Sequence, residues 1–191
     1  MKEVKLDRKT RYTRMVLQDS LIELMREKPI NKITIKELCE KADVNRTTFY
    51  AHYTDQYDLL RKIEDEVLSW AKDAFNTIIG TAADENETIK GLEGVCQYIV
   101  ENSKHLQVLM SEQGDIDFQK QLFTLVYQLW GMPPSSGQNG DADIKELYFI
   151  FAVNGSVGLI QYWLKNGLNQ SAKEIAHVIY SMAAPTLKLL L

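Results

Sequence analysis

The chain has 191 residues, of which 45% are hydrophobic and 25% are charged, a composition that is ordinary for globular proteins and excludes extended disorder. Its net charge of −4 conceals an asymmetry, because residues 1–50 carry a net charge of +4 and residues 51–191 carry −8. A basic N-terminal part on an acidic body indicates that only this part meets a polyanion, unless the asymmetry is a chance fluctuation of surface charge.

A first helix is predicted over about residues 9–27, and Pro29 closes it. Thr34 and Glu37 then match a capping box, in which the Thr34 hydroxyl accepts from the Glu37 amide and the Glu37 carboxylate reaches back to the Thr34 amide. This box fixes the start of a second helix. The apolar residues that recur at helical spacing in these two helices are Leu17, Leu21, Leu24 and Met25, then Ile35, Leu38, Cys39 and Ala42.

A tight turn at residues 43–44 leads to a third, short helix over residues 46–52, for which Asn45 is a good N-cap. Asp55 can cap a fourth helix that runs to Ile79. Beyond a polar break, further helices are predicted near residues 88–101, 103–111, 116–130, 142–166 and 171–189, with a loop at residues 131–140 and with Pro185 kinking or ending the last helix.

The second and third helices, joined by a tight turn, form a helix-turn-helix. In this motif the second helix lies in the major groove, where its N-terminal residues meet base edges. Arg46 can pair bidentately with guanine, and the hydroxyls of Thr47 and Thr48 can contact bases or phosphates. Tyr50 and His52 can donate to phosphates and fix the docking register. The free amides at the starts of the second and fourth helices are further phosphate sites.

At these residues the sequence resembles the TetR/AcrR family of bacterial regulators. The hallmark is the run Phe49-Tyr50-Ala51-His52-Tyr53, followed by a capped helix that carries Leu59 and Leu60, and the resemblance covers about residues 9–62. Two positions depart from the family pattern: Thr47 stands where a small residue is common, and Gln56 where a lysine often contacts phosphate. The expected DNA-binding residues are Thr34, Asn45, Arg46, Thr47, Thr48, Tyr50, His52, Tyr53 and Gln56.

For three residues of this region, a place in the hydrophobic core is considered as well as a contact with DNA. Phe49 and Cys39 are expected in the core, and Tyr53 is evenly divided between the core and a phosphate contact. The resemblance implies an all-α protein of about nine helices, with a three-helix DNA-binding domain at residues 1–54 and a helical effector-binding and dimerisation domain at residues 55–191.

The candidate effector pocket lies among the fourth to eighth helices, where large and partly polar side chains suit a small organic molecule. For each of these residues, packing in the core is an equally good reading. The candidates are Trp70, Tyr98, His105, Phe118, Tyr127, Trp130 and Phe149, accompanied by Phe75, Met110 and Tyr148.

Gly155 and Gly158, in an otherwise apolar helix, let another helix approach closely, and Tyr162 lies near them. By resemblance, the last two helices of two subunits form a four-helix dimer interface, with close packing inside one subunit as the alternative. A homodimer presents two recognition helices to successive major grooves and so fits a palindromic operator.

The sequence therefore predicts a DNA-binding transcriptional regulator, a repressor released from its operator by a small-molecule effector. The alternatives are an activator, and a helical interaction module without ligand control. An enzyme is not expected, because no nucleophile elbow, phosphate loop, zinc-protease motif or dinucleotide fingerprint is present and because His105 and His177 lack an evident partner. No cofactor or metal is expected from Cys39 and Cys96, which lack CxxC spacing.

A cytoplasmic location with no membrane contact is predicted as well. The N-terminal residues are charged and lack the apolar stretch of a signal peptide. No apolar run is expected to approach the length of a membrane span.

Overall fold

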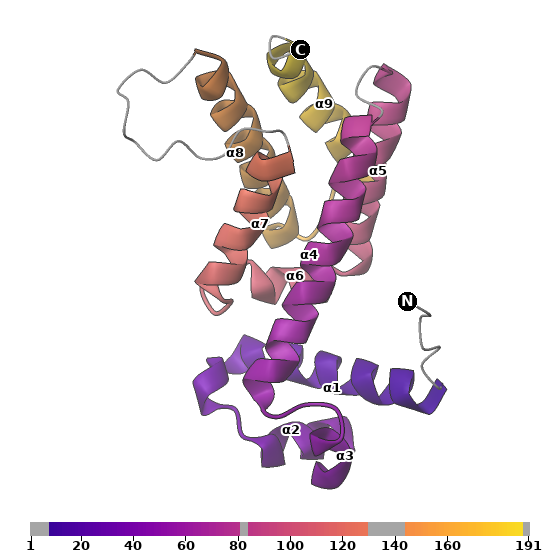
Figure 1. The fold of residues 1–191 in the computed structure, drawn as a ribbon, viewed down its shortest axis with the longest axis vertical. Helices are drawn as coiled ribbons and strands as arrows, with labels where there is room; N and C mark the ends of the chain where they lie inside the picture. Colours follow the sequence, from indigo (N-terminus) through magenta and orange to yellow (C-terminus); the bar gives the residue numbers. More distant parts are fainter. Residues whose placement is uncertain (1–7, 81–83, 130–143, 189–191) are drawn as a thin grey trace.

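The computed structural model describes residues 8–80, 84–129 and 144–188, which form nine α-helices and one short 3-10 helix, with no strand among them (Figure 1). The all-α fold class predicted from the sequence is confirmed. In chain order the elements are α1 (Arg8–Glu27), the 3-10 helix η1 (Ile30–Lys32), α2 (Ile35–Ala42), α3 (Arg46–Tyr50), α4 (Gln56–Gly80), α5 (Glu85–Glu101), α6 (Ser103–Leu109), α7 (Ile116–Leu129), α8 (Ile144–Lys165) and α9 (Ala172–Lys188).

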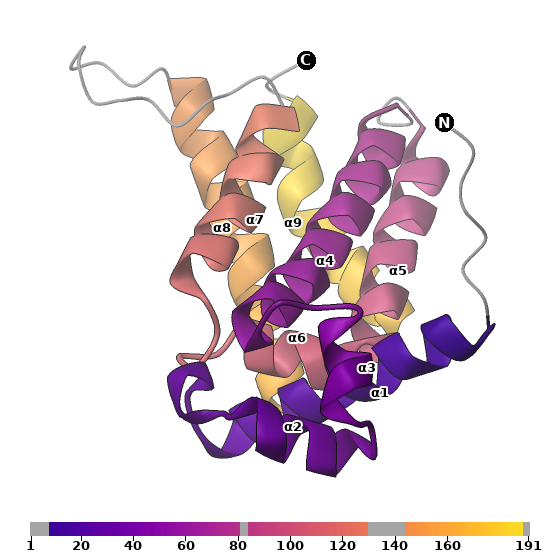
Figure 2. The same ribbon diagram turned by 60° about the horizontal axis from the view of Figure 1, so that its bottom comes forward.

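Helices α1, α2 and α3 lie together at one end of the molecule, called the head below, and helices α4 to α9 form the body (Figure 1). Helix α4 leaves the head and runs to the far end of the body, and α5 returns beside it. The short helix α6 lies between α1 and the rest of the body, as both views show (Figures 1 and 2). Helix α4 is thus the element that reaches both ends of the molecule.

The predicted capping box at the start of α2 is present. The Thr34 hydroxyl accepts a hydrogen bond from the Glu37 amide at 3.2 Å. The Glu37 carboxylate lies 2.5 Å from the Lys28 ammonium, and its pKa is lowered first by this ammonium and also by the Thr34 amide. The hydroxyl half of the box is therefore confirmed, and a lysine just after the end of α1 holds the Glu37 carboxylate.

The apolar stripe predicted for α1 is buried in full: Leu17, Leu21 and Met25 are 0% exposed and Leu24 is 4% exposed. These residues belong to one hydrophobic cluster that continues into the body through α4, α5, α6 and the ends of α8 and α9. Polar contacts add to this continuity, since Gln18 of α1 donates to the Glu66 carboxylate of α4 at 3.1 Å. The head is therefore packed on the body rather than tethered to it.

Several helix boundaries differ from the prediction, and α3, for example, ends at Tyr50 rather than at residue 52. Helix α5 begins at Glu85, three residues earlier than expected, because the Asp84 carboxylate accepts a hydrogen bond from the Glu87 amide at 3.1 Å and caps it. Helix α9 continues past Pro185 to Lys188, so this proline does not end the helix. The predicted loop at residues 131–140 lies outside the described residues.

The expectation that no segment approaches a membrane span in length was wrong. Residues Glu146–Lys165 of α8 form a stretch of 20 residues with a mean hydropathy of 1.3, of which 28% is buried. By length and composition alone such a helix can cross a bilayer, and a single one is weak evidence for a span. Several large hydrophobic side chains of α8 are exposed in the single chain, among them Leu147, Phe151 and Tyr162.

Candidate nucleic-acid interface and internal cavity

The short helix α3 is held by caps at its start and by one buried aromatic ring. Helix α2 ends at Asp43, which adopts the left-handed conformation with φ 52° and turns the chain sharply. The Asn45 carboxamide then accepts hydrogen bonds from the Thr48 amide at 2.7 Å and from the Thr48 hydroxyl at 3.0 Å. Phe49 is 0% exposed and anchors the inner side of the helix. The backbone of α3 is thereby fixed relative to α2.

The outer side of α3 is free. Asn45, Arg46 and Thr47 are exposed, Tyr50 is 57% exposed, and Arg46 forms no ion pair with the residues that the structure describes. An exposed, unpaired guanidinium on a capped helix can meet a base edge or a phosphate without first breaking a contact. This face therefore has the chemistry that sequence-specific DNA binding needs.

Four other predicted contact residues lie around this face, and one of them, Thr48, already uses its hydroxyl group within the chain. Thr48 is half-buried, and its hydroxyl proton is donated to Asn45. His52 is half-buried, and its carbonyl oxygen accepts a hydrogen bond from the Lys62 ammonium at 3.1 Å. The exposed Thr34 and the half-buried Gln56 stand at the starts of α2 and α4, respectively.

Tyr53 lies in the core. It is 3% exposed, its ring centroid is 5.7 Å from that of Phe49, and the Lys62 ammonium lies 4.9 Å from the ring. Burial raises the pKa of its hydroxyl. Of the two readings left open by the sequence, this burial favours the core, and Cys39, which is 4% exposed, and Phe49 occupy the core positions expected for them.

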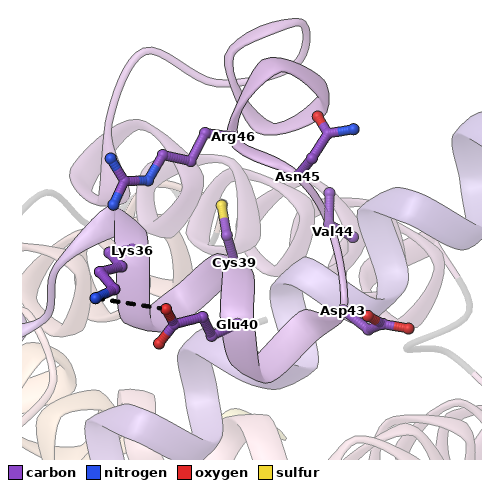
Figure 3. A pocket seen from close by; sticks show the side chains of 7 residues that line it. All are labelled: Lys36, Cys39, Glu40, Asp43, Val44, Asn45 and Arg46. Atoms are coloured by element: carbon purple, nitrogen blue, oxygen red, sulfur yellow. Dashed lines mark ion pairs between the residues drawn. The ribbon is translucent and has the colours of Figure 1, made fainter.

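A shallow hollow of about 380 Å³ opens between the end of α2 and the start of α3 (Figure 3). Arg46 and Asn45 lie on either side of the Cys39 thiol, and the Lys36 ammonium lies 3.8 Å from the Glu40 carboxylate. Burial raises the pKa of the Cys39 thiol, which keeps it neutral beside the guanidinium. The hollow thus brings together the cationic side chains of Lys36 and Arg46 and the carboxylates of Glu40 and Asp43.

The body contains an apolar cavity of about 110 Å³, partly open to the surface, between α4, α5, α6, α7 and α8. Two of the predicted pocket residues, Trp70 and Tyr98, line it together with Phe75 and Met110. Further lining residues that the sequence did not single out are Val67, Ala71, Val95, Ile99, Leu106, Leu122, Phe123, Val157, Ile160, Gln161 and Leu164. The apolar stripe of α4, which includes Val67 and Ala71, was the available signal for them.

The other predicted pocket residues that the structure describes are not among the residues that line this cavity. His105 Nε2 lies 2.8 Å from the Asp19 carboxylate, so the histidine has the partner that the sequence did not reveal. Phe118 is 1% exposed in the main core. Tyr127 and Phe149 pack edge to face at 5.2 Å in a second, smaller cluster. Trp130 lies outside the described residues.

Helices α8 and α9 share an exposed apolar face. Phe151 is 69% exposed, Tyr162 66% and Met182 71%, and a groove of about 210 Å³ runs between the two helices. A Cβ atom added at Gly155 or Gly158 would meet nothing within 4 Å inside the subunit. Among the described residues, neither glycine is therefore closely packed, which favours a role between two chains over close packing inside one.

One buried carboxyl group is unusual. Glu64 of α4 is 7% exposed, and its Oε1 has no hydrogen-bond partner among the described residues. Burial, followed by the nearby carboxylates of Asp115 and Asp65, raises its pKa to about 7. Within the described ranges, no group of three His, Cys, Asp or Glu residues could hold a metal ion.

The chain is similar to known regulators along most of its length. A family model described as bacterial regulatory proteins of the tetR family matches residues 19–63, and a model described as a transcriptional regulator C-terminal region matches residues 86–184, more than half of the chain. The HTH-type transcriptional regulator YxbF of Bacillus subtilis (strain 168) is 36% identical over 61 residues, which are 31% of this chain and 16% of that protein.

Two solved structures share the fold. A TetR transcriptional regulator from Streptococcus agalactiae 2603V superposes with a TM-score of 0.56 at 18% identity, covering 93% of this chain and 96% of that one. The dihydroxyacetone kinase operon activator DhaS superposes with a TM-score of 0.57 at 14% identity, covering 93% and 97%. At these identities the likeness concerns the fold alone.

Proposed function

The chain belongs to the TetR family of bacterial regulatory proteins, which are DNA-binding regulators rather than enzymes, and on this premise we propose that it represses transcription from a palindromic operator. The observation that carries the proposal is the outer face of α3. This face presents the unpaired guanidinium of Arg46 beside Thr47 and Tyr50, while Phe49 and the Asn45 cap hold the helix rigid behind them.

In this proposal Arg46 reads a guanine, Thr47 contacts a base or phosphate, and Tyr50 donates to a phosphate. The positive charge of Lys36, on the same side of the helix-turn-helix, attracts the phosphate backbone of the DNA. Tyr53 is left out of the contact surface because its ring is buried. The boundary between the DNA-binding and effector-binding parts is placed at residues 54 and 55, where the chain enters α4.

The active form in this proposal is a homodimer, the association typical of the family. The exposed apolar face of α8 and α9, with Phe151, Tyr162 and Met182, becomes buried when it meets the same face of a second subunit. Close approach at Gly155 and Gly158 brings the helices together. The pair of heads then spans two successive major grooves of the DNA. A regulator that acts on DNA in this way works in the cytoplasm, which is the location we propose.

Release from the operator requires a link between the cavity and the heads. Helix α4 supplies it, since the helix begins at Gln56 beside the head and since its Val67, Trp70 and Ala71 line the cavity. The two heads of the dimer can stand at a separation that fits the operator or at one that does not. An effector that binds the second state more tightly weakens DNA binding, by an amount set by its difference in affinity for the two states. Repression relieved by a small molecule is the resulting function.

Activation is the second candidate, because the fold is shared with a protein named as an operon activator. Selection of bound sequences from random DNA, using the full-length protein, tests the common part of both proposals. A palindrome with half-sites about one helical turn apart supports them, and recovery of unrelated sequences at low salt contradicts them. A reporter gene behind the selected site then separates the candidates, since repression lowers and activation raises its expression.

A further inference from the structure

The cavity in the body is bounded on one side by two stacked aromatic rings. The ring of Trp70 on α4 and the ring of Tyr98 on α5 have centroids 3.5 Å apart and planes inclined by 7°. Both rings line the cavity. The two rings therefore form a flat contact, called the seam below, between α4, the helix that reaches the head, and α5.

The lining of the cavity restricts the charge of a ligand. Among the fifteen residues that line it, none is charged, and the polar side-chain groups come from Trp70, Tyr98 and Gln161 alone. An ionised group moved from water into such surroundings loses its hydration without gaining a partner. A ligand of this cavity is therefore uncharged.

The volume of the cavity restricts the size and shape of a ligand. At about 110 Å³ it is smaller than an engineered apolar cavity of about 150 Å³ that binds benzene, so a ring-sized ligand needs additional space. Parting the Trp70–Tyr98 stack supplies this space in the form of a slot with two parallel aromatic walls. A slot of that shape favours a planar ring over a puckered one.

We propose that this cavity binds an uncharged, planar aromatic molecule that enters by separating the rings of Trp70 and Tyr98. Opening of the seam moves α4 away from α5, so the same event that admits the ligand acts on the helix that carries the head. The proposal names the ligand class for the regulatory site proposed above and rests on that function only for its effect on DNA. The binding itself is independent of DNA.

Three probes that share a six-membered ring with one attached carbon separate the possibilities: toluene, methylcyclohexane and benzoate. Binding to the full-length protein is followed by tryptophan fluorescence excited where toluene does not absorb, and by the melting temperature. We expect toluene to bind saturably, and methylcyclohexane to bind at least about fivefold more weakly because it lacks the ring contacts. Benzoate is expected to bind more than about tenfold more weakly because of its charge.

Two variants locate the site. Tyr98→Leu keeps an apolar wall but removes the stack, and should abolish the preference for toluene over methylcyclohexane. Phe118→Leu is the matched control, since this buried aromatic residue lies outside the cavity lining, and it should leave the preference intact. Circular dichroism and the melting temperature establish that each variant is folded, and Trp70→Phe provides a second folded variant in which the toluene-dependent fluorescence change should disappear.

The possible results of these experiments either contradict the proposal or support it. Equal binding of methylcyclohexane and toluene, tighter binding of benzoate, or no saturable binding of toluene overturns the proposal. Preferential binding of toluene that is lost in Tyr98→Leu supports it. If toluene binds in this way but leaves the affinity for operator DNA unchanged, the ligand class stands and the effector release proposed above is contradicted.

Discussion

His105 Nε2 of α6 lies 2.8 Å from the Asp19 carboxylate of α1, and this pair joins the body to the head across 86 residues of sequence. The His105 side chain is 24% exposed and the Asp19 side chain 55% exposed. Nearby, Arg26 donates to the Lys104 carbonyl oxygen at 3.2 Å, so a second polar contact links the same two helices. These contacts couple the position of α6 to that of α1, the helix on which the helix-turn-helix packs.

Replacing His105 with glutamine should weaken this link with little loss of stability, because exposed pairs contribute about 0–1 kcal/mol. The expected result is a smaller change in DNA affinity when the cavity is filled, with unchanged affinity in its absence. Anisotropy titrations of labelled operator, with and without ligand, measure both quantities. Lys120→Gln breaks an exposed ion pair of α7 instead and serves as the control. Full ligand response in His105→Gln would exclude the pair from the coupling.

Glu64 predicts a dependence of stability on pH. Its pKa is raised to about 7 in the folded protein, so the folded state binds the proton more tightly than the unfolded state does. The free energy of unfolding should therefore fall as pH rises from about 4.5 to about 7, by an amount on the order of 2–3 kcal/mol. Glu64→Gln, which cannot ionise, should lose this part of the pH dependence and exceed the wild type in stability at pH 8.

Urea unfolding at pH 5 and pH 8 measures the effect. Asp73→Asn is the matched control, because Asp73 is an exposed carboxylate on the same helix, and its pH dependence should equal that of the wild type. A Glu64→Gln protein whose stability falls between these pH values as steeply as that of the wild type would show that the carboxyl group is not held neutral by burial.

Asn45 has two roles that one pair of variants can separate. Asn45→Ala removes the side chain that caps α3 and should lower the free energy of unfolding by about 0.5–2 kcal/mol. Asn45→Asp keeps a good cap, so its stability should match that of the wild type, while its new negative charge should weaken DNA binding. Denaturant unfolding and operator titration of both variants provide the readouts. Equal DNA affinity of Asn45→Asp and wild type would place the phosphates away from the start of α3.

Phe151→Glu should convert the dimer into a monomer. Phe151 is 69% exposed on one subunit, and a carboxylate in its place would be buried without a partner in the dimer. Sedimentation at micromolar concentration should show the 21.9 kDa chain mass for this variant and twice that mass for the wild type. Ile116→Glu, at an apolar residue of α7 that is 64% exposed, should remain dimeric. A dimeric Phe151→Glu protein would contradict the assignment of the interface to this face.

Local features of the fold were predictable because they depend on neighbours in the sequence. The Thr34 cap, the Asn45 cap and the buried stripe of α1 each follow from residues at most eight positions apart. The start of α5 was missed because the capping preference of Asp84 was given less weight than the polar break around it. Of the two outcomes predicted for Pro185, an end of the helix is wrong, because a proline can be tolerated near the end of a helix.

The internal cavity was only partly predictable. Aromatic periodicity marks residues that face inward, but packing alone decides which of them border empty space. Trp70 and Tyr98 border the cavity, whereas Phe118 and Phe149 are enclosed by other side chains. The partner of His105 was hidden for a related reason, since Asp19 reaches it only once α1 packs on α6. Contacts between distant segments follow from the assembled fold, not from spacing.

We expect α3 to read DNA sequence through Arg46. Arg46→Ala removes the exposed guanidinium without disturbing Phe49 or the Asn45 cap, so circular dichroism should show a folded protein. Lys90→Ala, which removes one positive charge from the second turn of α5 in the body, is the control. The decisive measurement is fluorescence anisotropy of the selected operator against a scrambled duplex at fixed salt. Arg46→Ala should lose about 1–3 kcal/mol of operator binding free energy, and its preference for the operator over scrambled DNA should be reduced. The affinity and preference of Lys90→Ala should equal those of the wild type. Undiminished preference for the operator in Arg46→Ala would contradict this expectation.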